Sequence, residues 1–480
     1  MTQQHSLDVP RVLIAADRSS AGKTTIAVGL MSILSKEGQT VQPFKVGLDY
    51  IDPSYHSEVT GRFSRNLDGY LMNRQAIVEV FSHASRGADI GIVEGVRGLY
   101  EGLESLSDIG STAQVAKILR SPVILVIDAR SITRSTAALV RGYRSFDRRV
   151  NIKGVILNNI GSATHAAKAK EAIEHYTGID VIGQIPRDDS MHLAMRHLGL
   201  VPASEGLVRD RAFRKQLENI EDMIRGHLDV DKVIQIAKNA PPMPQVAPKV
   251  FVPSNEGRTR RAKVRIGVAY DETFNFYYHD LFDLFFLNDV DVVFFSPLRD
   301  GEIPSVHGVY LGGGYPELFA HELERNRSMR DSLASSAQEG LPIFAECGGL
   351  MYLTQSLEYD GRTSKMVGVI PAKTNMIHKR VIGYVAGTTI HDTIIGRKGT
   401  RFRGHEFHYS ELTDLSGKLE FAFKLQKGTG ISDGCDGIQV ENTLASYCHV
   451  HPLSYPNLPA TFVQSCAEFK DQKAHSTRSL

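Results

Sequence analysis

The first half of the 480-residue chain alternates short apolar segments with stretches of helical periodicity. Several of these segments are apolar almost throughout, which is typical of strands buried on both faces of a parallel sheet. Parallel strands need crossover connections, usually helices, so the alternation predicts an α/β fold. The segments expected to be strands are RVLIAA (11–16), VQPFKV (41–46), IGIVEG (90–95), PVILVID (122–128), IKGVILNN (152–159) and DVIGQIP (180–186).

A proline-rich stretch with positive charges, APPMPQVAPKVFVPSNEGRTRRAK, interrupts the alternation at 240–263. Behind it the apolar segments begin again with VRIGVAY, DVVFFS, HGVYLGGG and LPIFAE. A chain of this length usually divides into two or three domains. We therefore expect an α/β domain over 1–239, a linker over 240–263 and a second α/β domain over 264–480.

Composition excludes several classes of partner. Lys and Arg number 55 and Asp and Glu 54, so a net charge of +1 gives no general attraction to nucleic acid or to anionic membranes. No apolar run reaches 18 residues and the first residues lack a signal-peptide pattern, which favours a cytoplasmic protein. The four cysteines form no C-x-x-C pair. The oligomeric state stays open, with a homodimer as one option.

The segment AADRSSAGKTT (15–25) lies between an expected strand and an expected helix. Backbone N–H groups and the helix dipole favour a phosphate at such a position. Asp17 and Ser20 stand where phosphate loops often carry glycine, so a purely structural strand-to-helix turn is the alternative. The residues expected to hold the nucleotide are Ser19, Ser20, Gly22, Lys23, Thr24 and Thr25, with Thr24 also a ligand of Mg²⁺.

Two further segments place acidic residues where strands end. KVGLDYIDPSYH (45–56) carries Lys45, Asp49 and Asp52, and IVEGVRGLYEG (92–102) carries Glu94. Ligands bind at the carboxyl ends of strands in such sheets, and acids there can hold Mg²⁺ over phosphates. Either acid alone would be better explained as a solvated loop carboxylate. Together with the Gly-Lys-Thr sequence, they favour a metal–nucleotide site.

Cys347 in FAECGGLMYL (344–353) follows an expected strand and precedes an expected helix, as in a nucleophile elbow. The turn would expose the sulfur, the helix N-terminus would lower the thiol pKa, and the following N–H groups could serve an oxyanion. A buried structural cysteine is the alternative. The segment ASYCHVHP (445–452) supplies His449 and His451 as candidate bases, although two histidines at this spacing could instead bind a metal.

Four segments, QPFKVGLDYIDPSYH, RNLDGYLM, VEGVRGLYEG and AECGGLMYL, resemble the ATP- and glutamine-dependent tetrapyrrole a,c-diamide synthases. The resemblance extends over nearly the whole chain. The family contains cobyrinate a,c-diamide synthase and the nickel-sirohydrochlorin a,c-diamide synthase of methanogens. Arg97 and Leu48 resemble the nickel branch, because the cobyrinate branch more often has methionine and proline at these two positions.

The resemblance implies ligation of ammonia to the a and c acetate side chains of nickel-sirohydrochlorin, in biosynthesis of the nickel tetrapyrrole coenzyme of methanogenesis. Glutamine would supply the ammonia, and ATP with Mg²⁺ would activate each carboxylate as an acyl phosphate. Cobyrinate, in cobalamin biosynthesis, is the alternative substrate. Two readings from other classes are a P-loop ATPase switch protein, which needs neither Cys347 nor His449, and an inactive glutaminase-like binding domain.

The resemblance also implies folds and residue roles. The first domain would be dethiobiotin-synthetase-like and the second would be like a class I glutamine amidotransferase. Lys23 and Thr24 would contact phosphate and Mg²⁺, Asp49 and Glu94 would complete the metal shell, Lys45 would steady transferred charge, Asn158 would contact adenine, and His449 would be the base for Cys347. The candidates for oxyanion or substrate contacts are Gly313, Gly314, Gly348, Arg97, Arg403, His405 and His408.

Overall fold

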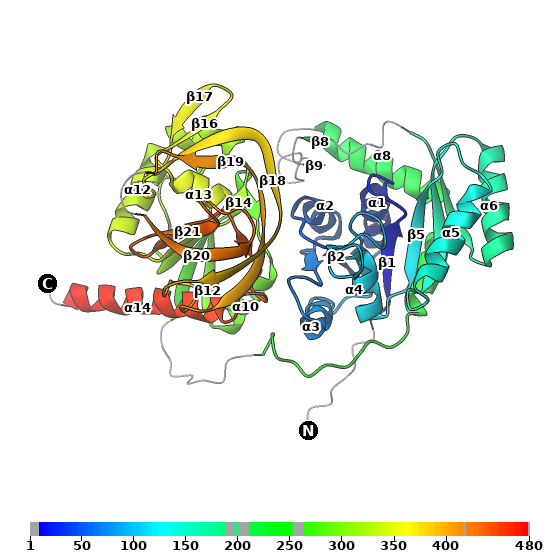
Figure 1. Cartoon of the computed structure of the whole chain (residues 1–480), viewed down its shortest axis with the longest axis horizontal. Helices are drawn as coiled ribbons and strands as arrows, with labels where there is room; N and C mark the ends of the chain where they lie inside the picture. Colours follow the sequence, from blue (N-terminus) through cyan, green and yellow to red (C-terminus); the bar gives the residue numbers. More distant parts are fainter. Residues whose placement is uncertain are drawn as a thin grey trace. The chain divides into compact units, whose positions relative to one another are not determined.

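The structure is a computed structural model that describes residues 9–188, 195–196, 199–200, 211–252, 263–415 and 419–478. The chain divides into two compact units, Met1–Val250 and Phe251–Leu480 (Figure 1). Both units are α/β, as the sequence predicts. Within the described residues, no helix is both long and apolar enough to cross a membrane.

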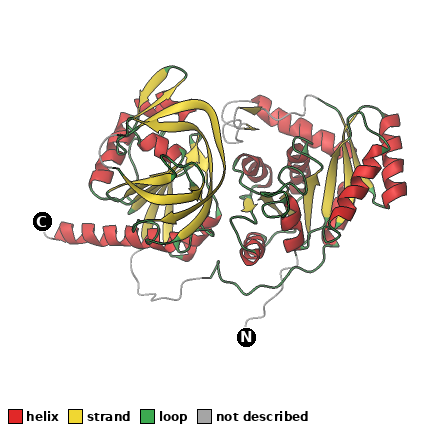
Figure 2. Cartoon of the chain, in the orientation of Figure 1, coloured by secondary structure: helices red, strands yellow, loops and turns green. Residues whose placement is uncertain are grey.

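The first unit contains a sheet of seven parallel strands in the order β3-β2-β4-β1-β5-β6-β7. All six apolar segments expected to be strands belong to it, and only the short β3 was not anticipated. Helices cover both faces of this sheet (Figure 2). Its strands are β1 (Arg11–Ala16), β2 (Val41–Val46), β3 (Arg65–Leu67), β4 (Ile90–Glu94), β5 (Val123–Asp128), β6 (Ile152–Ile160) and β7 (Val181–Pro186).

The crossovers between these strands carry the helices, as expected for parallel connections. A separate pair of short strands, β8 (Met195–Arg196) and β9 (Gly199–Leu200), follows the sheet. The helices are α1 (Lys23–Lys36), α2 (Ile51–Thr60), α3 (Arg74–Ala84), α4 (Thr112–Leu119), α5 (Ser135–Phe146), α6 (Ala163–Thr177), α8 (Arg211–His227) and α9 (Val230–Lys238).

Helix α8, whose sequence carries no chemical motif, packs on α1. Gly29 of α1 makes the approach close, since a Cβ there would lie 2.6 Å from the Ile224 side chain. Beside it, the Ser32 hydroxyl donates to the Glu221 carboxylate at 2.6 Å. α8 thus covers the helix that follows the phosphate loop.

The first part of the expected linker lies against the first unit. The Arg11 side chain is 1% exposed and its guanidinium donates to the Pro241 carbonyl. Further along, Glu79 Oε2 accepts the backbone N–H groups of Lys249 and Val250 at 2.8 Å each. Buried charged groups therefore hold both ends of the segment 241–250 in place.

The second unit is built on a mixed sheet. Its parallel part has the order β12-β10-β13-β15-β22, and antiparallel strands extend it through β21, β20 and β18. The strands of the mixed sheet are β10 (Val264–Ala269), β12 (Val290–Phe295), β13 (Gly308–Leu311), β15 (Ile343–Glu346), β16 (Ser356–Tyr359), β17 (Arg362–Lys365), β18 (Lys373–Thr389), β19 (Arg401–Thr413), β20 (Glu420–Lys427), β21 (Cys435–Val440), β22 (Thr443–Ser446) and β23 (His449–Val450). Two further strands, β11 (Phe274–Phe276) and β14 (Gly313–Gly314), pair with each other in a separate sheet.

Apolar side chains from helices and strands fill the core on the two faces of this sheet. The helices are α10 (Asp280–Leu287), α11 (Ala320–Arg325), α12 (Arg327–Gln338), α13 (Gly348–Leu353) and α14 (Leu458–Arg478). The register pairs Glu346 at the end of β15 with Ser446 at the end of β22. This pairing brings the segment around Cys347 to the segment around His449.

Candidate functional site

The phosphate loop turns from β1 into α1 through two residues with left-handed backbone, Ser20 (φ 59°) and Gly22 (φ 91°). A Cβ at Gly22 would lie 2.3 Å from Asn158 Nδ2, so this position has no room for a side chain. Asn158 Nδ2 also donates to the Ala21 carbonyl at 2.9 Å. The side chain expected to contact adenine therefore braces the phosphate loop.

The left-handed backbone at Ser20 gives a first test of the loop. Ser20→Gly should leave the free energy of unfolding unchanged or raise it by up to about 1 kcal/mol, because glycine adopts this conformation without a Cβ clash. Nucleotide binding should be retained. Gly22→Ala is the matched change in the opposite direction, and it should weaken both stability and nucleotide binding. Chemical denaturation and calorimetric titration with ATP would measure both, and a destabilised Ser20→Gly variant would contradict this view of the loop.

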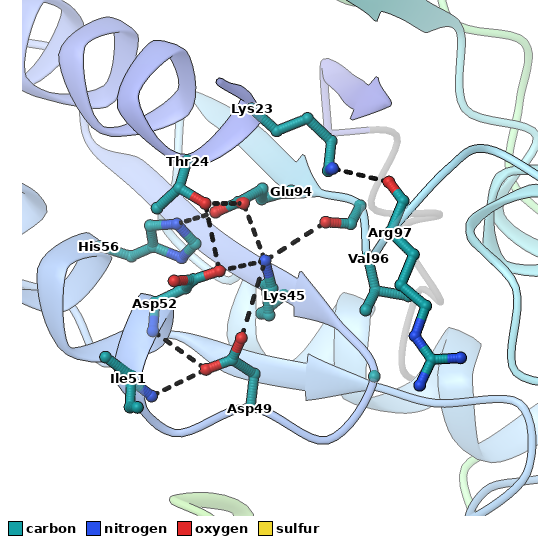
Figure 3. Close-up of polar contacts among 12 residues, drawn as sticks. Lys23, Thr24, Lys45, Asp49, Ile51, Asp52, His56, Glu94, Val96 and Arg97 are labelled. Atoms are coloured by element: carbon teal, nitrogen blue, oxygen red, sulfur yellow. Dashed lines mark hydrogen bonds and ion pairs between the residues drawn. The ribbon is translucent and has the colours of Figure 1, made fainter. Parts of the chain in front are cut away.

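Lys23 begins α1 and its side chain reaches across the sheet edge. Its Nζ donates to the Arg97 carbonyl at 2.6 Å (Figure 3). Burial and the neighbouring Lys45 lower the pKa of Lys23 to about 8. A bound anionic phosphate would raise this pKa again, because its negative charge favours the ammonium form of Lys23.

A second lysine lies among carboxylates. Lys45 Nζ is 2.8 Å from Glu94 Oε1 and also contacts Asp52 Oδ2. Thr24 Oγ1 is 2.6 Å from Glu94 Oε1 and 3.2 Å from Asp52 Oδ2. Burial lowers the pKa of Lys45, but Asp52 and Glu94 outweigh it and raise the pKa. The ammonium group therefore stays charged, and one lysine, one hydroxyl and two carboxylates meet at one point.

His56, on α2, orients the buried Glu94. Its Nε2 lies 2.7 Å from Glu94 Oε2 and its Nδ1 lies 3.3 Å from Ser64 Oγ, while both His56 and Glu94 are fully buried. Burial would raise the pKa of Glu94, but Lys45 and His56 hold it well below its usual range. Asp52 and His56 are four residues apart on α2 and so share one face. Asp52 was expected among the acids at the strand ends, whereas His56 was not anticipated; its spacing of four residues from Asp52 was the signal in the sequence.

Asp49, which the resemblance assigns to the metal shell, accepts backbone N–H groups in the structure. Its Oδ1 accepts the N–H groups of Ile51 and Asp52, at 2.8 and 3.1 Å, and so holds the first turn of α2. Burial and the neighbouring Asp52 raise the pKa of Asp49 to about 8. In the structure Asp52, rather than Asp49, lies beside Thr24 and Glu94 (Figure 3).

The oxygen atoms of Thr24, Asp52 and Glu94 fit Mg²⁺, which prefers hard oxygen ligands and takes one or two carboxylates together with phosphate oxygens. No group of three or more His, Cys, Asp or Glu side chains in the described ranges is arranged to hold a metal ion.

The two remaining loop residues differ in their surroundings. Ser19 is exposed on the loop, and Thr25 is half-buried in the first turn of α1.

Arg97 has a left-handed backbone (φ 49°) and an exposed side chain, while its carbonyl accepts from Lys23. In Figure 3 its guanidinium points away from Lys45.

In the second unit, Cys347 lies between β15 and α13 with φ 47° and ψ −98°. This is a strained conformation for a residue with a side chain, and it is the turn expected of a nucleophile elbow. The side chain is 4% exposed, and Sγ lies 3.7 Å from the Phe407 carbonyl. The strain therefore falls on the residue expected to act as nucleophile.

The charge state of the thiol differs from the expectation. Burial raises the pKa of Cys347, and the carboxylates of Glu317 and Glu346 raise it further. The N–H of Gly348 at the start of α13 lowers the pKa, but burial outweighs this effect. The resting thiol is therefore protonated, and a base must remove its proton.

The expected oxyanion glycines lie between the elbow and His449. A Cβ at Gly348 would come 3.0 Å from Gly314 N, and a Cβ at Gly313 would come 2.5 Å from His449 Cε1. The strand β14 that contains Gly313 and Gly314 pairs with β11. The structure thus brings Cys347, His449 and the glycines together.

The histidines of β19 are not the positive groups that a polycarboxylate substrate would need. His405 stacks on His449 with ring centroids 4.8 Å apart, and His408 stacks on Tyr447. Burial lowers the pKa of His405 well below its usual value and that of His408 to about 4, so both rings are neutral near pH 7. The two arginines of β19, Arg401 and Arg403, are both exposed.

The chain matches two family models. Residues 12–201 match the CobQ/CobB/MinD/ParA nucleotide binding domain, and residues 265–456 match the CobB/CobQ-like glutamine amidotransferase domain. Proteins named cobyrinate a,c-diamide synthase are similar over almost the full length. The one from Methanosarcina acetivorans is 54% identical over 97% of both chains, and the one from Methanosarcina barkeri is 53% identical over 97% of this chain and 98% of its own. The one from Archaeoglobus fulgidus is 43% identical over 97% of this chain and 99% of its own.

A nucleotide-binding domain followed by a glutamine amidotransferase domain defines a ligase that uses glutamine as amido donor. With relatives this similar over this length, the chain belongs to the cobyrinate a,c-diamide synthase family. The family predicted from the sequence is thus confirmed. The narrower expectation of the nickel branch finds no support in these relatives, whose names give cobyrinate.

Proposed function

We propose that this protein amidates the a and c acetate side chains of cobyrinate, using ATP and glutamine. The observation that supports this most is the 54% identity over 97% of the chain to a protein named cobyrinate a,c-diamide synthase. The two clusters of side chains, one around Lys23 and one around Cys347, supply the groups that the two half-reactions need. The reaction belongs to the biosynthesis of cobalamin.

The glutaminase half would act through Cys347. His449 takes the thiol proton while Sγ attacks the amide carbon of glutamine. His449 then gives this proton to the leaving nitrogen, so that ammonia departs as the thioester forms. Water then hydrolyses the thioester to glutamate and restores the thiol. Backbone N–H groups of the Gly313–Gly314 and Gly348 segments would be the donors that stabilise the oxyanion.

The ligase half would act at the phosphate loop. A substrate carboxylate oxygen attacks the γ-phosphorus of ATP, ADP leaves, and ammonia then displaces phosphate from the acyl phosphate to form the amide. Lys23 and Lys45 would stabilise the charge that develops on the phosphoryl oxygens. Mg²⁺, held by Thr24, Asp52 and Glu94, would neutralise the phosphate charge when bound.

Nickel-sirohydrochlorin is the second candidate substrate, and Arg97 with Leu48 favours it. Arg97 lies beside the nucleotide cluster, because its carbonyl accepts from Lys23, and its exposed guanidinium is free to meet a carboxylate. The same position more often carries methionine in the cobyrinate branch, as the resemblance implies.

Separate incubations with cobyrinate and with nickel-sirohydrochlorin would test the proposal, with ATP, Mg²⁺ and glutamine present in both. Mass spectrometry of the products counts the amidations, since each one replaces OH by NH₂. We expect diamide from cobyrinate at the higher kcat/KM. Product from nickel-sirohydrochlorin alone would reverse the assignment, and Arg97→Met should then shift the preference towards cobyrinate. Failure with both substrates would contradict both candidates.

A further inference from the structure

A buried carboxylate lies between the nucleophile strand and the histidine strand. Glu346 immediately precedes Cys347 and is 1% exposed. Its Oε1 accepts the Val450 N–H at 2.8 Å, and its Oε2 accepts the Tyr310 hydroxyl at 2.6 Å. One side chain thus connects β15, β13 and β23.

The same carboxylate faces the imidazole of His449. Glu346 Oε2 lies 4.0 Å from His449 Nδ1, and His449 is fully buried. The Cε1–Nε2 edge of the ring faces Gly313, because a Cβ there would come 2.5 Å from Cε1 and 3.3 Å from Nε2. Nδ1 is therefore on the Glu346 side, and Nε2 is on the side of the glycines that adjoin the Cys347 elbow.

This orientation matters when the ring becomes charged. His449 is neutral at rest, because burial lowers its pKa to about 3. A buried imidazolium without a counter-charge is costly, and a carboxylate at ion-pair distance reduces that cost. Hydrogen bonds of catalytic groups are often long before substrate binds, so 4.0 Å allows a bond to form during the reaction.

We propose that Glu346 is a positioning residue for His449 in glutamine hydrolysis. Its carboxylate accepts the Nδ1–H of the imidazole, so that Nε2 can take the Cys347 proton, and it balances the charge of the imidazolium that results. Tyr310 and the Val450 N–H hold the carboxylate in place. The inference rests on the proposed function, because it assigns His449 as the base.

A second carboxylate–histidine pair nearby provides a matched control. His451 Nε2 lies 3.6 Å from Asp280 Oδ2, and both side chains are buried. This pair resembles Glu346–His449 in burial and in charge, but Asp280 contacts the other histidine. Asp280→Asn therefore reports what the loss of any buried carboxylate in this unit does.

The test compares Glu346→Gln, Glu346→Asp and Asp280→Asn in the full-length protein. Glu346→Gln keeps oxygen and volume but removes the charge, so kcat for glutamine hydrolysis should fall by about 10²-fold or more while KM for glutamine stays nearly constant. Glu346→Asp, which keeps the charge, should retain more activity than Glu346→Gln. Amidation with free ammonia should be unchanged in both, and Asp280→Asn should keep kcat for glutamine hydrolysis within a few-fold of the unmodified protein.

Several results would overturn the positioning role: wild-type kcat in Glu346→Gln, a rise in KM without a fall in kcat, or an equal loss of kcat in Asp280→Asn. If Glu346→Gln does not fold, Tyr310→Phe takes its place, because it frees the carboxylate without removing it. An unchanged kcat in Tyr310→Phe would then count against the proposal. Absence of ammonia-dependent amidation in the unmodified protein would instead contradict the proposed function, so the two failures are distinguishable.

Discussion

Lys23→Ala is expected to abolish amide formation with either nitrogen source. Without the ammonium group that faces the phosphates, no acyl phosphate forms, and neither glutamine nor free ammonia can then give product. Loss of a preorganised charge at a developing anion typically costs about 10²- to 10³-fold in rate. Basal glutamine hydrolysis should persist, because Cys347 and His449 belong to the other unit. The measurement is amide product by mass spectrometry together with glutamate release.

Lys168→Ala serves as the control for Lys23→Ala, because Lys168 is an exposed lysine of α6 in the same unit. It should behave like the unmodified protein. Near-normal ATP-dependent amidation in a folded Lys23→Ala variant would show that the loop is a structural turn. Asp52→Asn and Glu94→Gln should resemble Lys23→Ala in part, with recovery at raised Mg²⁺ if these acids hold the ion.

Cys347→Ser should abolish glutamine-dependent product and leave product formation with concentrated free ammonia. The thiol is the nucleophile in our proposal, and removal of a nucleophile typically lowers the rate by roughly 10³-fold or more. The ligase half is unaffected because ammonia replaces the missing glutaminase product. Initial rates with each nitrogen source, at saturating ATP, measure the effect.

Cys435→Ser is the control for this variant, since Cys435 is a free, half-buried cysteine of the same unit. It should retain both activities. A folded Cys347→Ser protein that also fails with ammonia would contradict the division into two half-reactions. His449→Ala should resemble Cys347→Ser. A larger loss in His451→Ala would assign the base to the other histidine.

Much of the fold follows from local sequence. The six apolar segments of the first unit form the strands they predict, because near-continuous apolar runs are stable only when both faces are covered. The turn into α1 is equally local, since the Gly-Lys-Thr sequence lies between a strand and a helix. The Cys347 turn is also local, as it follows one strand and precedes α13.

Several functional contacts depend on strand order, which no local pattern specifies. Glu94 meets Lys45 because β4 lies beside β2, although the two residues are 49 positions apart. α2 then places His56 against Glu94 and Asp52 beside Thr24 and Lys45, whereas the family resemblance assigned Asp49 to the metal shell. The charge states of side chains also depend on the tertiary structure. Burial requires the whole fold, and it keeps the Cys347 thiol protonated and His408 neutral.

The sequence by itself determined the fold class, the family and the two strand-to-helix turns, at residues 15–25 and at Cys347. The tertiary structure decided which carboxylate meets which partner. Glu346 and His449 come together because β15 pairs with β22, and Glu346 then binds the N–H of Val450 beside the histidine. Such pairings bring distant residues together through the packing of whole strands, so the sequence near either residue does not contain them.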